Sequence, residues 1–251
     1  IHLKVLEIKD NKIICKVLVG GKISDNKGVN LPGANLTIKS LTKKDKSDIK
    51  FGIKNKVDFI AFSFVRTKKD VLELRNILKK SKSQAMIVSK IETMEAVENI
   101  DDILSVSDAV MIARGDLAVE IGAQNVPIVQ KNIIKKANKL GKPVITATQM
   151  LDSMENSPVP TRAEVSDVAN AIFDGTDAIM LSGETASGNY PVESVITMRQ
   201  IAKATELARQ KRQFVDLEKS DDVIDAVTLS VVRVAETVNA KAIIALTESG
   251  L

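Results

Sequence analysis

Residues 57–92 read VDFIAFSFVRTKKDVLELRNILKKSKSQAMIVSKIE, and this stretch decides the fold. The apolar run VDFIAFSF (57–64) is followed by KKDVLELRNILKK (68–80), in which the apolar residues recur at helical spacing. A second apolar run, AMIVSKI (85–91), follows the helical pattern. Two strands joined by a helix are typical of a parallel pair with a right-handed crossover connection.

The same strand–helix unit recurs along the chain. Strands are predicted to begin near residues 57, 85, 108, 143 and 177, and a helical pattern follows each of them. The strand runs are continuously apolar, which is expected when both faces of a parallel sheet are covered. The sequence therefore predicts an α/β fold with five successive strand–helix units, arranged either as a doubly wound sheet or as part of a barrel.

The two ends of the chain show sequence patterns that differ from the repeated strand–helix units. Residues 1–38 show short alternating apolar runs separated by Gly20-Gly21 and by Asn26-Lys27-Gly28, which predicts antiparallel β-structure with tight turns. The charged stretch 209–222 is interpreted as a linker. A helix over 225–239 and a strand over 241–247 are predicted to begin another α/β unit.

Composition excludes several kinds of site. Cys15 is the only cysteine and His2 the only histidine, so this chain has no internal disulfide, thiolate metal site or histidine cluster. The net charge of +4 is small, and the absence of Trp argues against a nucleic-acid partner. The lysine-rich run 39–56 also contains aspartates and is interpreted as a solvated surface rather than a phosphate-binding patch.

Location and completeness are also predicted. No apolar run approaches about 18 residues and no signal peptide is visible, so we expect no membrane association and a cytoplasmic protein. The chain starts with Ile1 rather than Met and stops at Leu251, just after Ser249-Gly250. We expect both ends to be cut from a longer protein.

Polar residues gather where successive strands end. The second strand ends in Lys90 and Glu92, and the next three end in the runs 113–116 (ARGD), 146–149 (TATQ) and 182–185 (SGET). Ligands bind at the carboxyl ends of the strands in both parallel architectures. The pattern therefore indicates an active-site face at this end of the sheet.

The residue types suggest the chemistry. Side chains alternate along a strand, so Lys90 and Glu92 are expected to point the same way. Glu92 and Asp116 could together hold a hard divalent cation such as Mg²⁺, and the lysine could neutralise charge on a transferring group. Gly115 would let the backbone approach an anionic ligand closely. Each feature also has a structural reading: an ion pair at the rim, a helix cap at Asp116 and a turn at Ser182.

Several longer motifs together resemble the pyruvate kinase family. They occur in that family's order and spacing and cover essentially the whole chain: GVNLPG (28–33), AMIVSKIETMEAV (85–97), VMIARGDLAVEI (110–121), KPVITATQMLDSM (142–154) and PTRAEV through PVE (160–193). The resemblance implies that 1–38 is the last part of a β-barrel lid domain. It implies that 39–207 is the last five units of a (β/α)₈ TIM barrel, and that 208–251 begins a C-terminal α/β domain.

The resemblance also implies a reaction, phosphoryl transfer from phosphoenolpyruvate to ADP in glycolysis. Lys90 would contact the transferring group, and Glu92 and Asp116 would bind Mg²⁺ or Mn²⁺. The backbone near Ala113, Gly115 and Asp116, together with Thr148, would hold the substrate carboxylate. Thr148 and Ser182 would lie near the path by which the enolate is protonated, although the family's proton donor can be a water molecule.

Parts of the family's machinery are expected to lie outside this chain. They include three barrel strands, the K⁺ ligands and most of an effector site that would begin at 247–251. The full-length protein is expected to be a homotetramer, and the isolated chain is expected to be inactive because five of eight strands cannot close the barrel. Two alternatives stay open: a metal-dependent aldolase or lyase of the phosphoenolpyruvate/pyruvate barrel class, and a non-catalytic fragment.

Overall fold

The computed structural model of the chain describes residues 1–23, 25, 28–29, 40–211 and 223–246. The chain divides into two compact units, residues 1–34 and residues 35–251. Across the described ranges, no helix combines the length and apolar character that crossing a membrane requires.

The first unit contains an antiparallel hairpin. Strands β1 (His2–Lys9) and β2 (Lys12–Val19) pair from His2 with Val19 to Lys9 with Lys12, and Asp10 turns the chain with a φ of 50°. This agrees with the antiparallel structure predicted for the start of 1–38. Most of the predicted turn at 26–28 lies outside the described residues. Residues 30–33 of the GVNLPG motif lie outside them entirely.

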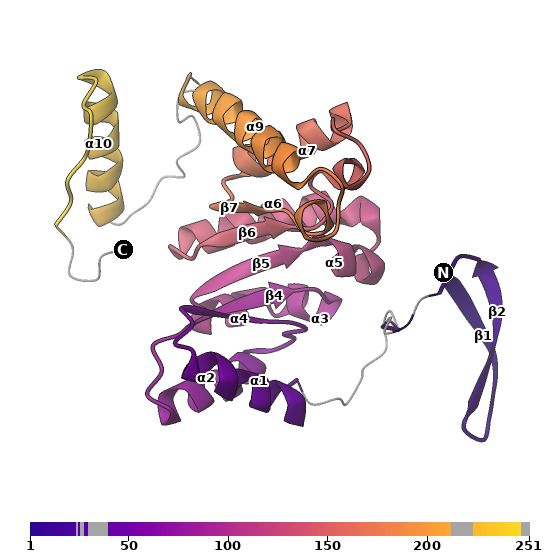
Figure 1. The fold of residues 1–251 in the computed structure, drawn as a ribbon. Coiled ribbons are helices and arrows are strands. Elements are labelled where there is room, and N and C mark those ends of the chain that lie inside the picture. The colour runs from indigo at the N-terminus through magenta and orange to yellow at the C-terminus, as the bar shows by residue number, and fades with distance from the viewer. Residues whose placement is uncertain (24, 26–27, 30–39, 212–222, 247–251) are drawn as a thin grey trace. The chain divides into compact units, whose positions relative to one another are not determined.

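The second unit is built on a five-stranded parallel sheet (Figure 1). Its strands are β3 (Phe59–Phe62), β4 (Met86–Ile91), β5 (Ala109–Ala113), β6 (Val144–Ala147) and β7 (Ala178–Met180), and each begins within two residues of its predicted start. The spatial order β3-β4-β5-β6-β7 is the order along the chain. A doubly wound sheet would reverse direction at a switch point, so the order selects the arrangement found in a (β/α)₈ barrel.

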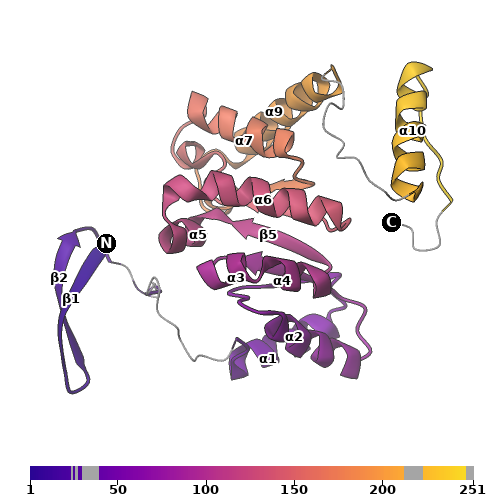
Figure 2. The same ribbon diagram turned by 180° about the vertical axis from the view of Figure 1, so that it is seen from behind.

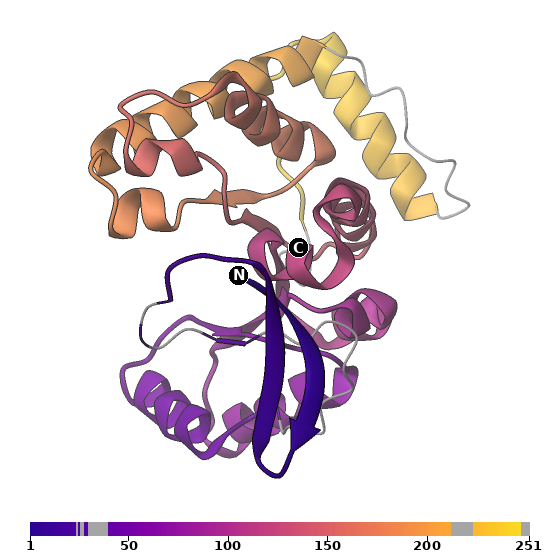
Figure 3. The same ribbon diagram turned by 90° about the vertical axis from the view of Figure 1, so that its right-hand side faces the viewer.

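Helices follow every strand and lie along one side of the sheet, as the reverse view and the side view show (Figures 2 and 3). The longer ones are α2 (Lys68–Lys80), α6 (Val126–Lys139), α7 (Arg162–Asp174) and α9 (Pro191–Lys211), and α1 (Lys43–Lys54) precedes β3. Shorter helical segments are α3 (Met94–Glu98), α4 (Ile100–Val106), α5 (Arg114–Ile121), α8 (Gly183–Ala186), η1 (Ala123–Asn125) and η2 (Asp152–Glu155).

The core lies between the helices and the sheet. Ile87, Ile91 and Ile112 point to the helical side and belong to the largest buried cluster. Val88 and Met111 point to the opposite face, where the buried cluster is small. Burial of both faces was predicted from the apolar strands, but among the described elements helices cover only one, and the small cluster lies on the face that a closed barrel would turn inward.

Helix starts are fixed by side chains that cap them. Thr42 with Asp45 at α1, and Thr161 with Glu164 at α7, form reciprocal capping boxes. Burial raises the pKa of Glu164, but hydrogen bonds from Ser153 and Thr161 outweigh it, and the net pKa is lowered. Gly175 ends α7 with a φ of 97°, which a residue with a Cβ rarely adopts.

The C-terminal part contains α10 (Val223–Thr237), as predicted from the pattern over 225–239. The strand predicted over 241–247 is wrong for residues 241–246, which form no strand. No described strand pairs with this segment, and Ile244 and Leu246 are 92% and 100% exposed. The linker predicted over 209–222 is wrong for residues 209–211, because α9 continues through Lys211. Residues 212–222 lie outside the described residues.

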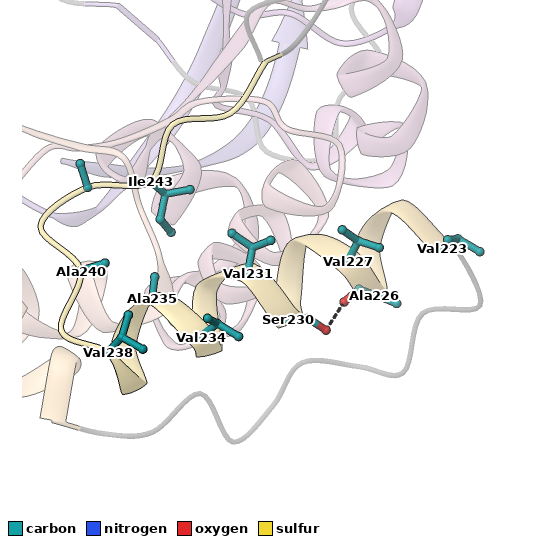
Figure 4. A pocket seen from close by; sticks show the side chains of 11 residues that line it. Val223, Ala226, Val227, Ser230, Val231, Val234, Ala235, Val238, Ala240 and Ile243 are labelled. Carbon is teal, nitrogen blue, oxygen red and sulfur yellow. Dashed lines mark hydrogen bonds between the residues drawn. The ribbon is translucent and has the colours of Figure 1, made fainter.

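An apolar groove of about 630 Å³ runs along α10 and the segment after it (Figure 4). Val227, Val231 and Ile243 are among its lining residues, and its polar member Ser230 donates its hydroxyl to the carbonyl oxygen of Ala226 at 2.8 Å. The groove contains no ionisable side chain. Its lining cannot perform acid–base or metal chemistry, so the site is sought at the strand ends of the parallel sheet.

Candidate active site

Lys90 and Glu92 meet at the carboxyl end of β4. Ile91, between them, points to the helical side and packs in the main core. Because side chains alternate along a strand, Lys90 and Glu92 lie on the opposite face of the sheet, the face that also carries Val88. The Nζ atom of Lys90 lies 2.6 Å from Oε1 of Glu92. The side chain of Glu92 is 1% exposed and that of Lys90 is 23% exposed. The pair is therefore anchored on its carboxylate side and reaches solvent on its ammonium side.

The end of β3 holds the same pair from the neighbouring strand. Lys90 Nζ donates to Oγ of Ser63 at 2.9 Å, and the backbone amide of Phe64 donates to Oε2 of Glu92 at 2.6 Å. Phe64 has a φ of 53°, in the left-handed region that a bulky residue rarely adopts. Sequence reasoning missed both residues because it treated VDFIAFSF as one strand, whereas β3 ends at Phe62.

A second carboxylate lies at the end of the next strand. Ile91 pairs with Ile112 across β4 and β5, so Glu92 and the start of α5 follow at the same edge of the sheet. Asp116 lies in the first turn of α5, is half-buried, and forms no hydrogen bond or ion pair through its carboxylate with another described residue. No group of three or more His, Cys, Asp or Glu is gathered among the described residues.

Two carboxylates on adjacent strand ends fit a magnesium ion. Mg²⁺ takes oxygen ligands and is commonly held by one or two carboxylates, with waters and substrate oxygens completing its shell. Glu92 and Asp116 could supply such oxygen ligands from two adjacent strand ends. The residue set suits a hard cation, but not a zinc ion that needs nitrogen or sulfur ligands.

The start of α5 is arranged for close approach of an anion. Its N-cap is Ala113, whose side chain cannot accept from the free amides of the first turn. Gly115 lies against Thr148 so closely that a Cβ atom there would be 2.8 Å from Cγ2 of the threonine. The hydroxyl of Thr148 makes no hydrogen bond to any described residue. The amides of α5 and this hydroxyl are therefore available to the oxygens of an anionic group.

Arg114 clamps the loop that carries Thr148. Its guanidinium donates to the carbonyl oxygens of Thr148 at 2.8 Å and of Gln149 at 3.4 Å, and pairs with Asp167 of α7 at 2.7 Å. The residue is only 9% exposed. Thr148 and Gln149 both have positive φ, 77° and 53°, and strained backbone of this kind persists where surrounding contacts impose it. The sequence contained a signal for this role, a single arginine directly after a fully buried strand.

Ser182 lies at the same edge, two residues beyond β7. Its backbone amide donates to Oε2 of Glu184 at 2.7 Å, and Oε1 of Glu184 accepts from the amide of Leu151 at 3.1 Å. Glu184 is 1% exposed, so this carboxylate joins the loop after β6 to the loop after β7. The role of Glu184 was not predicted, because Ser182 was the only residue of the SGET run that was assigned a role in the site.

Two contacts therefore unite the predicted residues directly, Lys90 with Glu92 and Gly115 with Thr148. Asp116, Ala113 and Ser182 lie at the same edge of the sheet without an ion pair among the predicted residues. The arrangement combines an ammonium group, two carboxylates, free helix amides and a hydroxyl. Such a set can bind an anionic substrate, orient it against a cation and neutralise charge that moves during a transfer reaction.

Comparison with known proteins agrees with this geometry. The family model described as "Pyruvate kinase, barrel domain" matches residues 1–195. Curated proteins named pyruvate kinase from Staphylococcus epidermidis and Staphylococcus aureus are each 53% identical over the whole of this chain. The chain spans 44% of the length of these relatives. With the family model covering more than three quarters of its residues, the chain belongs to the pyruvate kinase family.

Proposed function

We propose that the protein carrying this chain transfers the phosphoryl group of phosphoenolpyruvate to ADP, giving pyruvate and ATP. The observation that carries the proposal is the Lys90–Glu92 pair at the end of β4, 2.6 Å apart and supported from β3, in a chain that belongs to the pyruvate kinase family. Phosphoryl transfer depends on positioning and charge stabilisation more than on covalent chemistry, and the residues at this edge supply both.

Each residue is assigned one task. The ammonium of Lys90 contacts the oxygens of the moving phosphoryl group and offsets their charge. The α5 amides near Ala113, Gly115 and Asp116, with the hydroxyl of Thr148, bind the substrate carboxylate. These contacts hold the enol oxygen and the phosphoryl group in one orientation while the P–O bond to the substrate breaks and a P–O bond to ADP forms.

Glu92 and Asp116 would hold Mg²⁺ or Mn²⁺. When bound, the cation would act as a Lewis acid that offsets the negative charge of the transferring group. The role of the protein is to present the two carboxylates from adjacent strands and to hold the Glu92 carboxylate in place through Lys90 and the Phe64 amide. K⁺ dependence and a homotetrameric assembly are part of the same proposal by family membership, with the K⁺ ligands outside this chain.

The enolate left after transfer must gain one proton at carbon to become pyruvate. Thr148 and Ser182, at the ends of β6 and β7, are the candidate hydroxyls for passing or orienting that proton. Neither hydroxyl is committed to another described residue. A hydroxyl that gives its proton to the enolate must then be reprotonated. A water molecule bound between the two hydroxyls could supply that proton or protonate the enolate itself.

The test is ATP formation from phosphoenolpyruvate, ADP and Mg²⁺, followed with luciferase. The full-length protein and the 251-residue chain are assayed side by side. We expect activity in the full-length protein and none in the isolated chain, because its five-stranded sheet is open at β3 and β7. If the full-length protein forms no ATP but splits a pyruvate-containing substrate, the lyase alternative replaces the proposal.

A further inference from the structure

Lys90 has three N–H donors, and the structure accounts for two of them. One is directed to Oε1 of Glu92 at 2.6 Å and one to Oγ of Ser63 at 2.9 Å. The three donors of an ammonium diverge tetrahedrally. Two fixed contacts therefore set the direction of the third donor, which is left for a ligand because the lysine side chain is 23% exposed.

The Ser63 contact follows from the sheet register. Phe62 pairs with Ser89 across β3 and β4, so Ser63 and Lys90 come next at the same level. Phe62 packs into the main core on the helical side, which turns Ser63 to the face that carries Lys90. The serine is half-buried at the edge of the sheet and its hydroxyl has the lysine ammonium as its partner.

The backbone turn after Ser63 also holds Glu92, the second partner of Lys90. Phe64 adopts a φ of 53°, although its side chain is half exposed and gains little from burial there. The turn directs the Phe64 amide to Glu92 Oε2 at 2.6 Å, while Val65, fully buried, fixes the chain just beyond it. A backbone conformation of this kind persists where surrounding contacts impose it.

We propose that Ser63 is a positioning residue for phosphoryl transfer: its hydroxyl, with Glu92, aims the ammonium of Lys90 at the substrate. This inference rests on the proposed function. Ser63 acts through Lys90 and is not assigned contact with the reacting atoms. Without the Ser63 hydroxyl, Lys90 would keep its contact with Glu92 but would be free to rotate about it.

The experiment compares Ser63→Ala, Ser63→Thr and Ser83→Ala in the full-length protein. Ser83 is a matched control, because among the described residues the partner of its hydroxyl is the amide of Ala85, in the turn before β4. We expect Ser63→Ala to lower kcat by about tenfold, the value of one charge-assisted hydrogen bond. Mg²⁺ affinity and melting temperature should stay near those of the parent. Ser63→Thr, which keeps the hydroxyl, should recover most of the rate.

A second readout does not depend on turnover. Reductive methylation of Lys90, followed by peptide mass spectrometry, should be faster in Ser63→Ala than in the parent, whereas Lys131 should react equally in both. Unchanged Lys90 reactivity, or a normal kcat in Ser63→Ala with an active parent, would overturn the inference. If the parent forms no ATP, the proposed function fails, and Lys90 reactivity still decides whether Ser63 orients the ammonium.

Discussion

Gly115 and Thr148 touch across the ends of β5 and β6, and a Cβ atom at residue 115 would lie 2.8 Å from Cγ2 of the threonine. That distance is too short for carbon atoms that are not bonded, so the contact requires glycine. The same contact brings the first turn of α5 against the residue assigned to the substrate carboxylate. A Cβ atom at 115 would clash with the Thr148 methyl group, so the threonine that carries the hydroxyl would have to shift or rotate.

Gly115→Ala is therefore expected to lower kcat/KM for phosphoenolpyruvate by roughly tenfold to a hundredfold, the effect of displacing a positioning group by about 1 Å. Gly52→Ala in α1 is the matched control, since its Cβ would meet Val57 at an ordinary 3.4 Å. It should stabilise the protein by about 0.5–1 kcal/mol and leave kinetics unchanged. Steady-state kinetics of both variants decide the point; equal kcat/KM values would refute the positioning role.

Arg114→Lys tests whether the guanidinium holds the 148–149 loop. Lysine keeps the charge but cannot reach two carbonyls and Asp167 at once, so we expect a loss of about 2–3 kcal/mol in the free energy of unfolding. Arg75→Lys is the control, because Arg75 also joins a carbonyl oxygen and an aspartate, but contacts one carbonyl oxygen where Arg114 contacts those of both Thr148 and Gln149. It should cost less than Arg114→Lys, because fewer carbonyl contacts are lost. Equal losses in thermal or urea unfolding would remove the special role of Arg114.

Glu92→Gln and Asp116→Asn test the metal assignment. Each change removes one anionic ligand while keeping the shape of the side chain, so Mn²⁺ affinity should fall by more than about tenfold. Glu120→Gln, also in α5 but not assigned to the metal, should bind Mn²⁺ normally. Direct titration by electron paramagnetic resonance measures free Mn²⁺ without any turnover. Unchanged affinity in both variants would show that the cation binds elsewhere.

The lowered pKa of Glu164 predicts that part of the stability of the folded protein is lost at acid pH. Its pKa is lowered in the folded protein, because hydrogen bonds from Ser153 and Thr161 outweigh the opposing effect of burial. A lowered folded pKa adds stability above the unfolded value, about 4.3, and that stability is lost as pH falls through the folded pKa.

Glu164→Gln should therefore destabilise the protein at pH 7 by about 1 kcal/mol, as loss of a cap does, and by less at pH 3. Glu73→Gln, which removes one exposed ion pair with Lys46, should change little at either pH. Urea unfolding at the two pH values gives the comparison. A Glu164→Gln difference that grows on acidification would contradict the sign of the pKa shift.

The strands and their starts could be predicted because β4 and its neighbours are short, continuously apolar runs between clear helical patterns. The barrel-like strand order could not be predicted, since apolar runs are equally compatible with a doubly wound sheet. Only the pairing of neighbouring strands in space distinguishes the two arrangements. Residues 241–246 were predicted as a strand for the same local reason. A strand needs a partner, and no described strand pairs with this segment.

At the site, the charged residues could be found because Lys90, Glu92 and Asp116 are conspicuous after apolar strands. Ser63 could not, because it lies inside an apolar run and its role depends on the register between β3 and β4. Arg114 and Glu184 act through backbone groups of other loops. Contacts between residues more than thirty positions apart, such as Arg114 with the Thr148 carbonyl, leave no local pattern in the sequence.

The most direct measurement is the rate of ATP formation by full-length protein carrying Lys90→Met, together with its Mn²⁺ affinity. Methionine keeps the length of the side chain and removes the ammonium that pairs with Glu92 at 2.6 Å. Lys131→Met, which removes the ammonium of a 58% exposed side chain from its pair with Asp174, away from the site, serves as the control. We predict that Lys90→Met abolishes transfer and still binds Mn²⁺, with Lys131→Met fully active. Near-normal ATP formation by Lys90→Met would contradict the assignment of this pair to phosphoryl transfer.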